Sequence, residues 1–479
     1  MWIVQHNRDG EQKSFNQFGR FSLLLIAAFS LAEAGSFKDF QRVQNAAFSQ
    51  YKDKKDTAFE SYLKSQWSEY NSFISSSLYK EAKPKVILPA SIQPVLARGP
   101  NIHLKVLKKA QKQAAPLLKT GKGLEVGFFG SLLHFSVDAK VKRARFYPQN
   151  RNGIINAFSI FASSDYNPLL YEIKKSSKSM KLNEWGVYLL VQKIADKTFS
   201  DLDDKKLFAW FLLNKLGYDT KVGIHAQHIA LLSRTKQLIY AAAKYIIEGK
   251  SYFLLSKNPI HGALYTYSKS YPNATKAVDF SLDTLPLLVQ NTQSKTRTFS
   301  MQNRQYSISY RYNKNFIDFM NTYPQVSYSV YFSTPLQEET LFDIQKSLKP
   351  YLDGKKMTYG LDFLLRFVQT AFKYERDQQQ FGKEKVMFAQ ETLYYDKSDC
   401  EDRATLYARL VKKLFGISVV GVQYSNHMAT ALYIPINGAG VHVHGKRYVI
   451  ADPTYIDANV GESMPQYRSV IPDKFIYLR

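Results

Sequence analysis

The chain has 479 residues, of which 45% are hydrophobic, so it is long enough for two or three domains with buried cores. Its 65 Lys and Arg residues against 40 Asp and Glu give a formal net charge of +25. These lysines are spread along the chain, so attraction to an anionic envelope surface and a general lysine bias of the source proteome both account for the charge. A single cysteine excludes an internal disulfide.

Residues 1–34 predict a signal peptide. Arg20 precedes an apolar run over 21–31, and Ala32-Glu33-Ala34 fits a small-x-small cleavage site. The run is too short to cross a bilayer as a helix. We therefore expect an exported, periplasmic protein cleaved near Ala34, for which nucleic acid is not an expected partner. Because the stretch before Arg20 is long, a start site placed too early and an uncleaved anchor are the alternatives.

Aromatic pairs recur every 11 residues in the next segment, as Phe37/Phe40, Phe48/Tyr51, Phe59/Tyr62 and Tyr70/Phe73. This period keeps one stripe on a continuous α-helix, so we predict a long amphipathic helix over 36–82. The helix either packs along its own catalytic domain or supports self-association or partner binding. Prolines 84, 89, 94 and 100 then predict an extended linker over 83–100.

A larger and weaker repeat follows the linker. Residues 185–192 resemble 359–366, residues 200–204 resemble 398–402, residues 214–218 resemble 413–417, and residues 249–254 resemble 445–450. Both copies are preceded by stretches that alternate aromatic and polar residues, 132–164 and 306–334, which predict strands. We interpret the chain as a tandem duplication over 124–260 and 296–479, each copy being a β-rich segment followed by an α+β unit.

Cys400, the only cysteine, lies in the most informative motif. Ser398 followed by Glu401 is a capping box, so we expect a helix to begin at Ser398 and to hold Cys400 in its first turn. The positive end of that helix is expected to lower the pKa of the thiol. The helix is expected to end near Gly416 and to be followed by a strand over 417–422.

His427 opens the next apolar segment, and Asp452 follows a strand predicted over 446–451. Cysteine, histidine and aspartate in this order suit nucleophilic catalysis: a thiolate attacks a carbonyl, an imidazole moves the proton, and a carboxylate orients the imidazole. Taken singly, a buried cysteine, a core histidine and an Asp-Pro turn are ordinary structural features. Their combination indicates a catalytic design, either active or a relic.

The first copy lacks most of this chemistry. Leu202 replaces the cysteine, Ser256 replaces the aspartate, and only His228 remains. A leucine cannot act as a nucleophile, so we predict that this copy is inactive. It would then serve as a scaffold, a substrate-recognition module or a regulator.

The motif 398–402, the later His427 and the strand end at 452–454 resemble the transglutaminase-like superfamily of papain-fold cysteine enzymes. The resemblance covers roughly residues 359–454. It implies an α+β papain-like fold, present here in tandem with a degenerate first copy. It also implies that Cys400 is the nucleophile, His427 the general base and acid, and Asp452 the residue that orients the imidazole. Members of that superfamily act as proteases, amidases or transamidases, and some have lost activity.

An insertion over 374–397 distinguishes the second copy and is expected to lie beside Cys400, as a substrate-binding loop or as a structural excursion. The backbone N–H of Cys400 is a candidate oxyanion donor. Gln369, Tyr374 and Tyr395 are candidate oxyanion or pocket residues. We expect no metal site and no cofactor, because His442 and His444 lack a third ligand and no phosphate-binding loop is present.

These features predict an exported cysteine protease or amidase that cleaves a peptide or isopeptide carbonyl of an envelope protein through an acyl-thioester. Hydrolysis is the default because water needs no acceptor groove. The alternatives are a protein-crosslinking transamidase and a non-catalytic binding or assembly protein with a relic triad. In that last case the N-terminal helix and the inactive copy would be the functional parts.

Overall fold

The computed structural model describes residues 54–105, 123–255 and 262–478. The predicted signal peptide, the first two of the four aromatic pairs and Ser256 lie outside these described residues. Within them, no helix combines the length and the apolar character that crossing a bilayer requires.

The single helix predicted over 36–82 is wrong in its last third. Residues 54–63 are helical, but Ser68–Ile74 form strand β1, so Tyr70 and Phe73 lie on a strand. Strand β1 pairs with one strand on each side, at Ser72 with Tyr245 and at Asn71 with Ala263. This pairing satisfies its backbone on both edges and overrides the local helical period.

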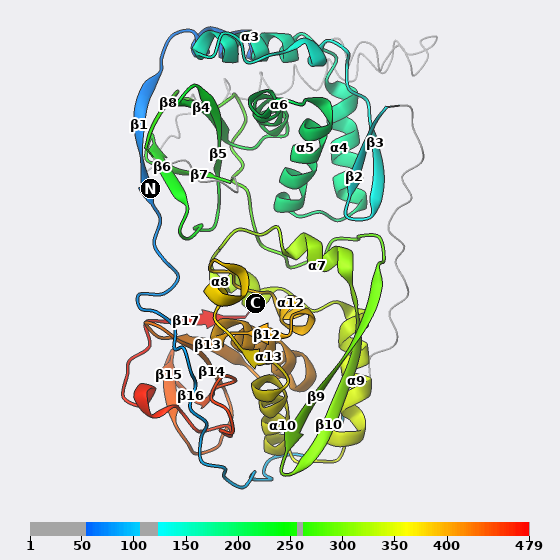
Figure 1. The fold of residues 1–479 in the computed structure, drawn as a ribbon, viewed down its shortest axis with the longest axis vertical. Coiled ribbons are helices and arrows are strands. Elements are labelled where there is room, and N and C mark those ends of the chain that lie inside the picture. Colours follow the sequence, from blue (N-terminus) through cyan, green and yellow to red (C-terminus); the bar gives the residue numbers. More distant parts are fainter. Residues whose placement is uncertain (1–53, 106–122, 256–261, 479) are drawn as a thin grey trace, which may run out of the picture. The chain divides into compact units, whose positions relative to one another are not determined.

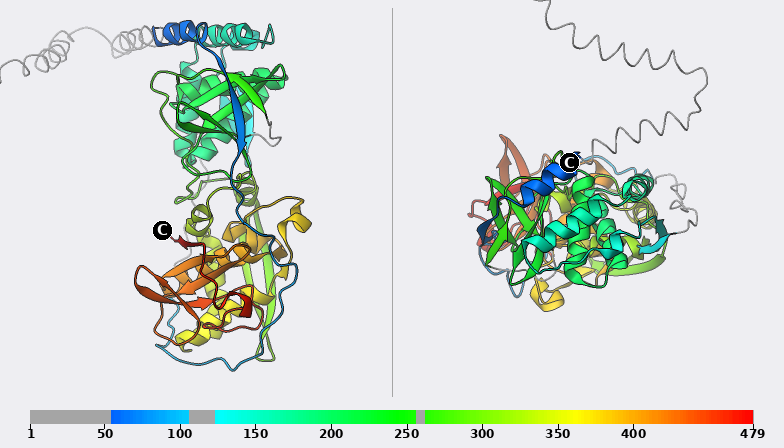
Figure 2. Two further views of the ribbon diagram at one scale, coloured as in Figure 1. Left: turned by 90° about the vertical axis from the view of Figure 1, so that its left-hand side faces the viewer. Right: turned by 90° about the horizontal axis from the view of Figure 1, so that it is seen from above.

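Strand β1 completes a closed barrel in which the described strands follow the order β1-β6-β7-β5-β4-β8 (Figure 1). The bounds are β4 (Thr220–His225), β5 (His228–Arg234), β6 (Ala243–Ile247), β7 (Lys250–Leu254) and β8 (Ala263–Thr266). Leu232, Tyr245, Tyr252 and Leu264 are among the buried residues packed together in this barrel. Figure 2 shows β1, in blue, against the green strands of the barrel.

A hairpin and a set of helices precede the barrel strands. Their bounds are β2 (Leu124–Phe128), β3 (Ser131–Phe135), η1 (Val141–Arg143), α3 (Arg151–Ala162), α4 (Asn167–Ser179), α5 (Glu184–Thr198) and α6 (Leu202–Lys215). The expectation of strands over 132–164 is wrong beyond residue 135. The side chain of Asn150 caps α3, and Ile154, Phe158 and Phe161 then follow a helical spacing and are buried.

The C-terminal segment repeats this plan from a longer hairpin, β9 (Thr292–Met301) with β10 (Arg304–Asn313). Helices again follow where the sequence pattern predicted strands to 334. The elements up to the Cys400 helix are α7 (Lys314–Met320), α8 (Tyr328–Ser333), α9 (Glu338–Leu352), α10 (Met357–Thr370), β11 (Lys373–Tyr374), α11 (Asp377–Phe381), α12 (Ala389–Tyr394), β12 (Lys397–Ser398) and α13 (Cys400–Phe415).

The remaining elements are β13 (Val419–Gln423), β14 (Met428–Leu432), β15 (Gly440–Val443), β16 (Lys446–Ala451), η2 (Pro465–Tyr467) and β17 (Lys474–Tyr477). Their strands form a sheet of order β15-β16-β14-β13-β17. The barrel contains the same succession as β6-β7-β5-β4-β8, and in both cases a hairpin and helices come first. The duplication remains an interpretation, and this matching strand order favours it.

Residues 75–104, which include the extended linker predicted over 83–100, lie against the rest of the protein. Their backbone is bonded to the C-terminal segment along its length: Lys80 N–H and Glu81 N–H donate to Ser425 O, and Ala90 N–H donates to Ile456 O. We call this segment the strap; it continues in blue from β1 in Figures 1 and 2.

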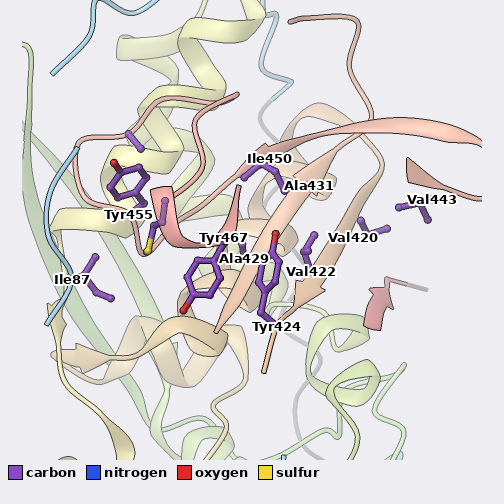
Figure 3. Packing of buried hydrophobic residues seen from close by; sticks show 12 residues of the cluster. Ile87, Val420, Val422, Tyr424, Ala429, Ala431, Val443, Ile450, Tyr455 and Tyr467 are labelled. Carbon is purple, nitrogen blue, oxygen red and sulfur yellow. The ribbon is translucent and has the colours of Figure 1, made fainter. Parts of the chain in front are cut away.

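One strap side chain enters the core of the sheet. Ile87 is buried in a cluster with Tyr455 and Tyr467 (Figure 3), whereas its neighbours Val86 and Leu88 are 73% and 78% exposed. This alternation is that of an extended chain lying on a surface with one apolar anchor.

Helix α10 holds the loop that follows Asp452. The carboxylate of Asp362 accepts a hydrogen bond from Val460 N–H at 2.7 Å, and the Arg366 guanidinium donates to Asp457 Oδ1 at 2.8 Å. Burial raises the pKa of Asp362 to about 7, against the opposing effects of the Val460 hydrogen bond and Arg366. Ionisation of Asp362 therefore destabilises the folded state at neutral pH and above.

We predict that Asp362→Asn stabilises the protein at pH 8 and much less at pH 5. The folded pKa lies above the unfolded one, so the stability of the wild type falls as pH rises from about 4 to about 7. Asn keeps an acceptor for Val460 N–H but cannot ionise. Urea unfolding is expected to show a gain that is larger at pH 8 by roughly 2–3 kcal/mol.

Asp279→Asn is the control of opposite sign. Partial burial acts to raise the pKa of Asp279, but hydrogen bonds from Lys236 and Gln237 outweigh it and hold that pKa below its ordinary value. Its replacement is expected to destabilise the protein at pH 8. An Asp362→Asn gain that does not change between the two pH values would contradict the argument from burial.

Candidate active site

Helix α13 begins one residue later than the predicted capping box. Asp399 is the N-cap, and its box partner is Asp402, whose carboxylate accepts from Asp399 N–H at 3.3 Å. Ser398 belongs instead to β12, and its hydroxyl accepts from Arg403 Nε at 3.1 Å. Cys400 is therefore the first residue of the helix, which ends before Gly416 in the left-handed conformation, as expected.

The sheet brings His427 and Asp452 together. His427 directly precedes β14, Asp452 directly follows β16, and these strands are antiparallel neighbours, so the two residues lie at the same end of the sheet. His427 Nε2 and Asp452 Oδ2 are 2.8 Å apart, and both side chains are buried. Asp452 Oδ1 in turn accepts from Thr454 N–H at 2.9 Å, which fixes the carboxylate.

The second ring nitrogen of His427, Nδ1, is not engaged by Asp452. Within the described part of the chain, Nδ1 has no hydrogen-bond partner although it is buried. The ring stacks on Tyr467, with centroids 4.9 Å apart and planes 15° apart. Burial first, and then the charges of Cys400 and Asp452, raise the pKa of Tyr467, so this ring lies within electrostatic range of both groups.

The thiol of Cys400 is completely buried, with an exposed fraction of 0%. Its Sγ donates to Glu401 Oε2 at 3.2 Å and lies 3.5 Å from the hydroxyl of Tyr79, a strap residue. Tyr79 also donates to Glu401 Oε2 at 3.0 Å. The described structure contains no hydrogen bond between Sγ and His427 Nδ1.

This environment opposes a thiolate. Burial raises the pKa of Cys400 well above its ordinary value, and the negative charges of Glu401 and Asp399 raise it further. The expectation of a lowered pKa at the helix start is therefore wrong for this state. Loss of solvation and two adjacent carboxylates outweigh the favourable helix end.

Lys83 of the strap supplies the nearest positive charge. Its Nζ lies 2.6 Å from Asp399, 2.8 Å from Glu401, 2.9 Å from Glu384 and 3.2 Å from Asp377. We call these four carboxylates the ammonium pocket. Burial acts to lower the pKa of Lys83, but the surrounding carboxylates, Glu401 and Asp399 foremost, raise it far above the ordinary value.

The charges in and around the pocket shift the pKa values of its own carboxyl groups. Burial and the neighbouring carboxylates Asp402 and Glu401 raise the pKa of Asp377 to about 9. Glu401 behaves oppositely: burial acts to raise its pKa, but Lys83 lowers it overall. The carboxylate oxygens of Asp377, Glu384 and Glu401 lie within 4.8 Å of one another, a spacing that could hold a metal ion.

Gln369 does not serve as an oxyanion donor in this structure. Its buried Nε2 donates to the carbonyls of Asp452, Tyr455 and Ala458, at 3.2, 2.7 and 3.0 Å. Gln369 thus holds the loop that carries Asp452. Among the candidates named from the sequence, it is a supporting residue.

Tyr374 lies beside the thiol. Strand β11 pairs with β12, which places Tyr374 opposite Ser398, and the charge of Cys400 is the largest contributor after burial to its raised pKa. Its hydroxyl donates to Pro84 O of the strap at 2.7 Å. Tyr395, by contrast, donates to Asn321 on an exposed surface.

The insertion over 374–397 does lie next to the site, because it contributes Asp377 and Glu384 to the ammonium pocket. Sequence patterns did not identify Tyr79, Lys83 or Tyr467. Tyr79 lies in the segment predicted to be a long helix, Lys83 lies in the predicted linker, and no motif surrounds Tyr467. The only available signal was the unusual density of acids at 399–402 around a helix start.

The equivalent positions of the first copy look different. Leu202 begins α6 and is 66% exposed. His228 Nδ1 bonds to Asp203 at 2.9 Å, and its side chain is 68% exposed. No buried thiol or covering strap residue is described there.

No protein-family model, curated protein or solved structure matches this chain. The chemistry of the buried residues around Cys400 is therefore the basis for the proposals that follow.

We predict that Gln369→Leu destabilises the protein by roughly 1–3 kcal/mol, because it removes the side-chain donor to three carbonyls, of which those of Asp452 and Tyr455 keep only a backbone donor. Urea unfolding measures the loss. Gln378→Leu, on an exposed position of α11, is the control and is expected to have little effect. Equal stability of the two variants would show that Gln369 does not hold the Asp452 loop.

Proposed function

We propose that this protein is an exported cysteine enzyme of the transglutaminase-like kind that cleaves an amide carbonyl, in the manner of a protease or amidase. The observation that carries the proposal is the buried His427–Asp452 pair, whose remaining imidazole nitrogen has no described partner and whose ring stacks on Tyr467, a residue within electrostatic range of the thiol of Cys400. A buried, carboxylate-oriented histidine with one nitrogen unused is costly as a purely structural feature and useful for proton transfer.

The proposed reaction follows from which nitrogen is engaged. Asp452 accepts the Nε2 proton and holds the tautomer in which Nδ1 is a base. Nδ1 takes the proton of the Cys400 thiol, the sulfur bonds to the substrate carbonyl carbon, and the C–N bond breaks. The same proton passes to the departing amine. Water then cleaves the thioester, which regenerates the thiol.

The strap gives this enzyme a covered resting state. Tyr79 contacts the buried thiol, and burial together with Glu401 and Asp399 raises the pKa of Cys400, although Lys83 and the Tyr79 hydroxyl act to lower it. Substrate access therefore requires the strap to move. Tyr374, which now donates to the Pro84 carbonyl, is the side chain we propose as donor to a substrate carbonyl once the strap has left.

The raised pKa of Cys400 also favours a second candidate, a non-catalytic envelope protein in which the triad is a relic. The two candidates differ in what happens when the strap is released. An enzyme gains a reactive, histidine-dependent thiol, whereas a relic gains only an accessible one.

Ile87→Glu is the variant that releases the strap, because it places a carboxylate among Tyr455 and Tyr467. We predict that it increases alkylation of Cys400 by iodoacetamide at least roughly tenfold over the wild type. Leu88→Glu, the adjacent but 78% exposed position, is the matched control and is expected to label like the wild type. Near-UV circular dichroism verifies that each variant remains folded.

Catalysis is then tested on the Ile87→Glu background with an activated acyl ester and mass detection of the thioester. His427→Ala is expected to reduce acylation by about 10²-fold or more while leaving the thiol accessible. Cys400→Ala is expected to abolish it. Acylation that is indifferent to His427, from a thiol titrating near 8.5, would establish the relic.

A further inference from the structure

The strap places a primary ammonium group in a site built from carboxylates beside the candidate nucleophile. Lys83 comes from a segment about 300 positions away in the chain, yet its Nζ contacts Asp377, Glu384, Asp399 and Glu401 within 3.2 Å. Glu401 links this site to the chemistry, because its other oxygen accepts from Cys400. A cation bound here is therefore one side chain away from the thiol.

Among the described residues, no cation other than Lys83 is ion-paired with the pocket: the buried Arg403 interacts with Asp399 electrostatically, but its guanidinium donates to Ser398, Gln369 and Phe372. Lys385, the other nearby lysine described, is paired with Glu391. Asp377, Asp399 and Glu401 are each at most 1% exposed, and Asp377 Oδ1 and Asp399 Oδ1 have no hydrogen-bond partner among the described residues. Buried carboxylates without a counterion are strongly unfavourable, so strap release calls for a replacement cation.

The strap also resembles a bound peptide in its other contacts. Its chain is extended, its backbone N–H groups at Lys80 and Glu81 bond to Ser425, and its Pro84 carbonyl accepts from Tyr374. An extended chain with one carbonyl held by a tyrosine beside a cysteine has the form of a ligand in a cleft. Lys83 is the residue immediately before that carbonyl.

We propose that the ammonium pocket is a substrate subsite for a primary ammonium group, and that the strap occupies it as a tethered mimic until a lysine-bearing peptide displaces it. The assignment of the pocket as a substrate subsite, and of the strap as a group that a substrate displaces, rests on the proposed acyl-transfer function. Binding of an ammonium group to the pocket does not depend on that function and is tested separately.

Lys83→Ala removes the tethered group and leaves room for n-propylammonium, which matches the missing Cγ, Cδ, Cε and Nζ atoms. We expect this cation to raise the Tm of full-length Lys83→Ala saturably, by roughly 3 °C or more. The wild type is expected not to respond, because Lys83 fills its pocket. Lys80→Ala, three positions away and paired only with the exposed Asp473, is the matched control and is also expected not to respond.

Three solutes at equal ionic strength identify what the pocket recognises. Tetramethylammonium carries the charge without N–H donors, propanol has the shape without the charge, and calcium offers a divalent charge. A Tm rise specific to propylammonium supports the proposal. A rise with calcium but not propylammonium overturns it in favour of a metal site, and no rise with any of the four overturns it outright.

Lys83→Ala/Asp377→Asn addresses the case in which the single variant does not fold. It removes the ammonium group together with one of the acids that contact it, so fewer buried carboxyl groups are left without Lys83, while Asp399 and Glu401 remain to bind the ammonium. A weaker but still propylammonium-specific Tm rise is expected. Absence of any response in this folded variant overturns the proposal.

A last measurement separates this proposal from the function on which it rests. Two acyl probes of matched size, a lysyl and a norleucyl peptide ester, are offered to Lys83→Ala, and at least tenfold faster acylation of Cys400 by the lysyl probe is expected. Propylammonium binding without acylation by either probe would support the pocket and refute the acyl-transfer function. Equal acylation by both probes without propylammonium binding would support the acyl-transfer function and refute the ammonium subsite.

Discussion

The contact between Lys83 and the carboxylates at the start of α13 is the interaction on which the site depends. Asp399, Glu401 and Asp402 are all completely buried at one helix end, and Asp377 and Glu384 approach from the insertion. So many acidic groups cannot remain ionised together in a dry interior without a counterion, because the desolvation of each costs several kcal/mol. The strap meets part of this constraint with a single ammonium group, and the raised pKa values of Asp377, Asp399 and Asp402 show that neutral carboxyl groups meet the rest.

The same charges determine the state of the thiol. A helix N-terminus stabilises an adjacent anion by about 0.3–1 kcal/mol in ordinary settings, whereas burial of an ion costs several times more. Cys400 lies at a helix N-terminus and is also buried, with the carboxylate of Glu401 at 3.2 Å. Burial and the carboxylate outweigh the helix end, so the pKa of the thiol is raised. Release of the strap would act on this pKa in two directions: access of water to the sulfur would lower it, whereas loss of Lys83 and of the Tyr79 hydroxyl, which both lower it now, would raise it.

Part of this site could be predicted from the sequence and part could not, for reasons that individual residues show. Turn residues and the order of the predicted strands indicated three features: the end of α13 at Gly416, the strand before Asp452, and the pairing of His427 with Asp452. These signals are properties of residues that are close together in the sequence. The covering strap did not, because nothing near Lys83 indicates a partner some 300 residues later. The aromatic period that predicted one long helix failed at β1 for a related reason: the hydrogen bonds that β6 and β8 offer to Ser68–Ile74 are long-range.

The position of β1 also gives the first copy a role that its residues alone do not suggest. Strand β1 lies between β6 and β8, and its last residue, Ile74, precedes Tyr79 by only five positions. Ser75, directly after the strand, is buried and bonded through its hydroxyl to the carbonyl of Ala242 at 3.1 Å. The strap therefore starts from a fixed point in the barrel, which lowers the entropy lost when it closes over Cys400. The barrel thus holds one end of the segment that contacts Cys400, a structural role that does not require a cysteine in the barrel unit.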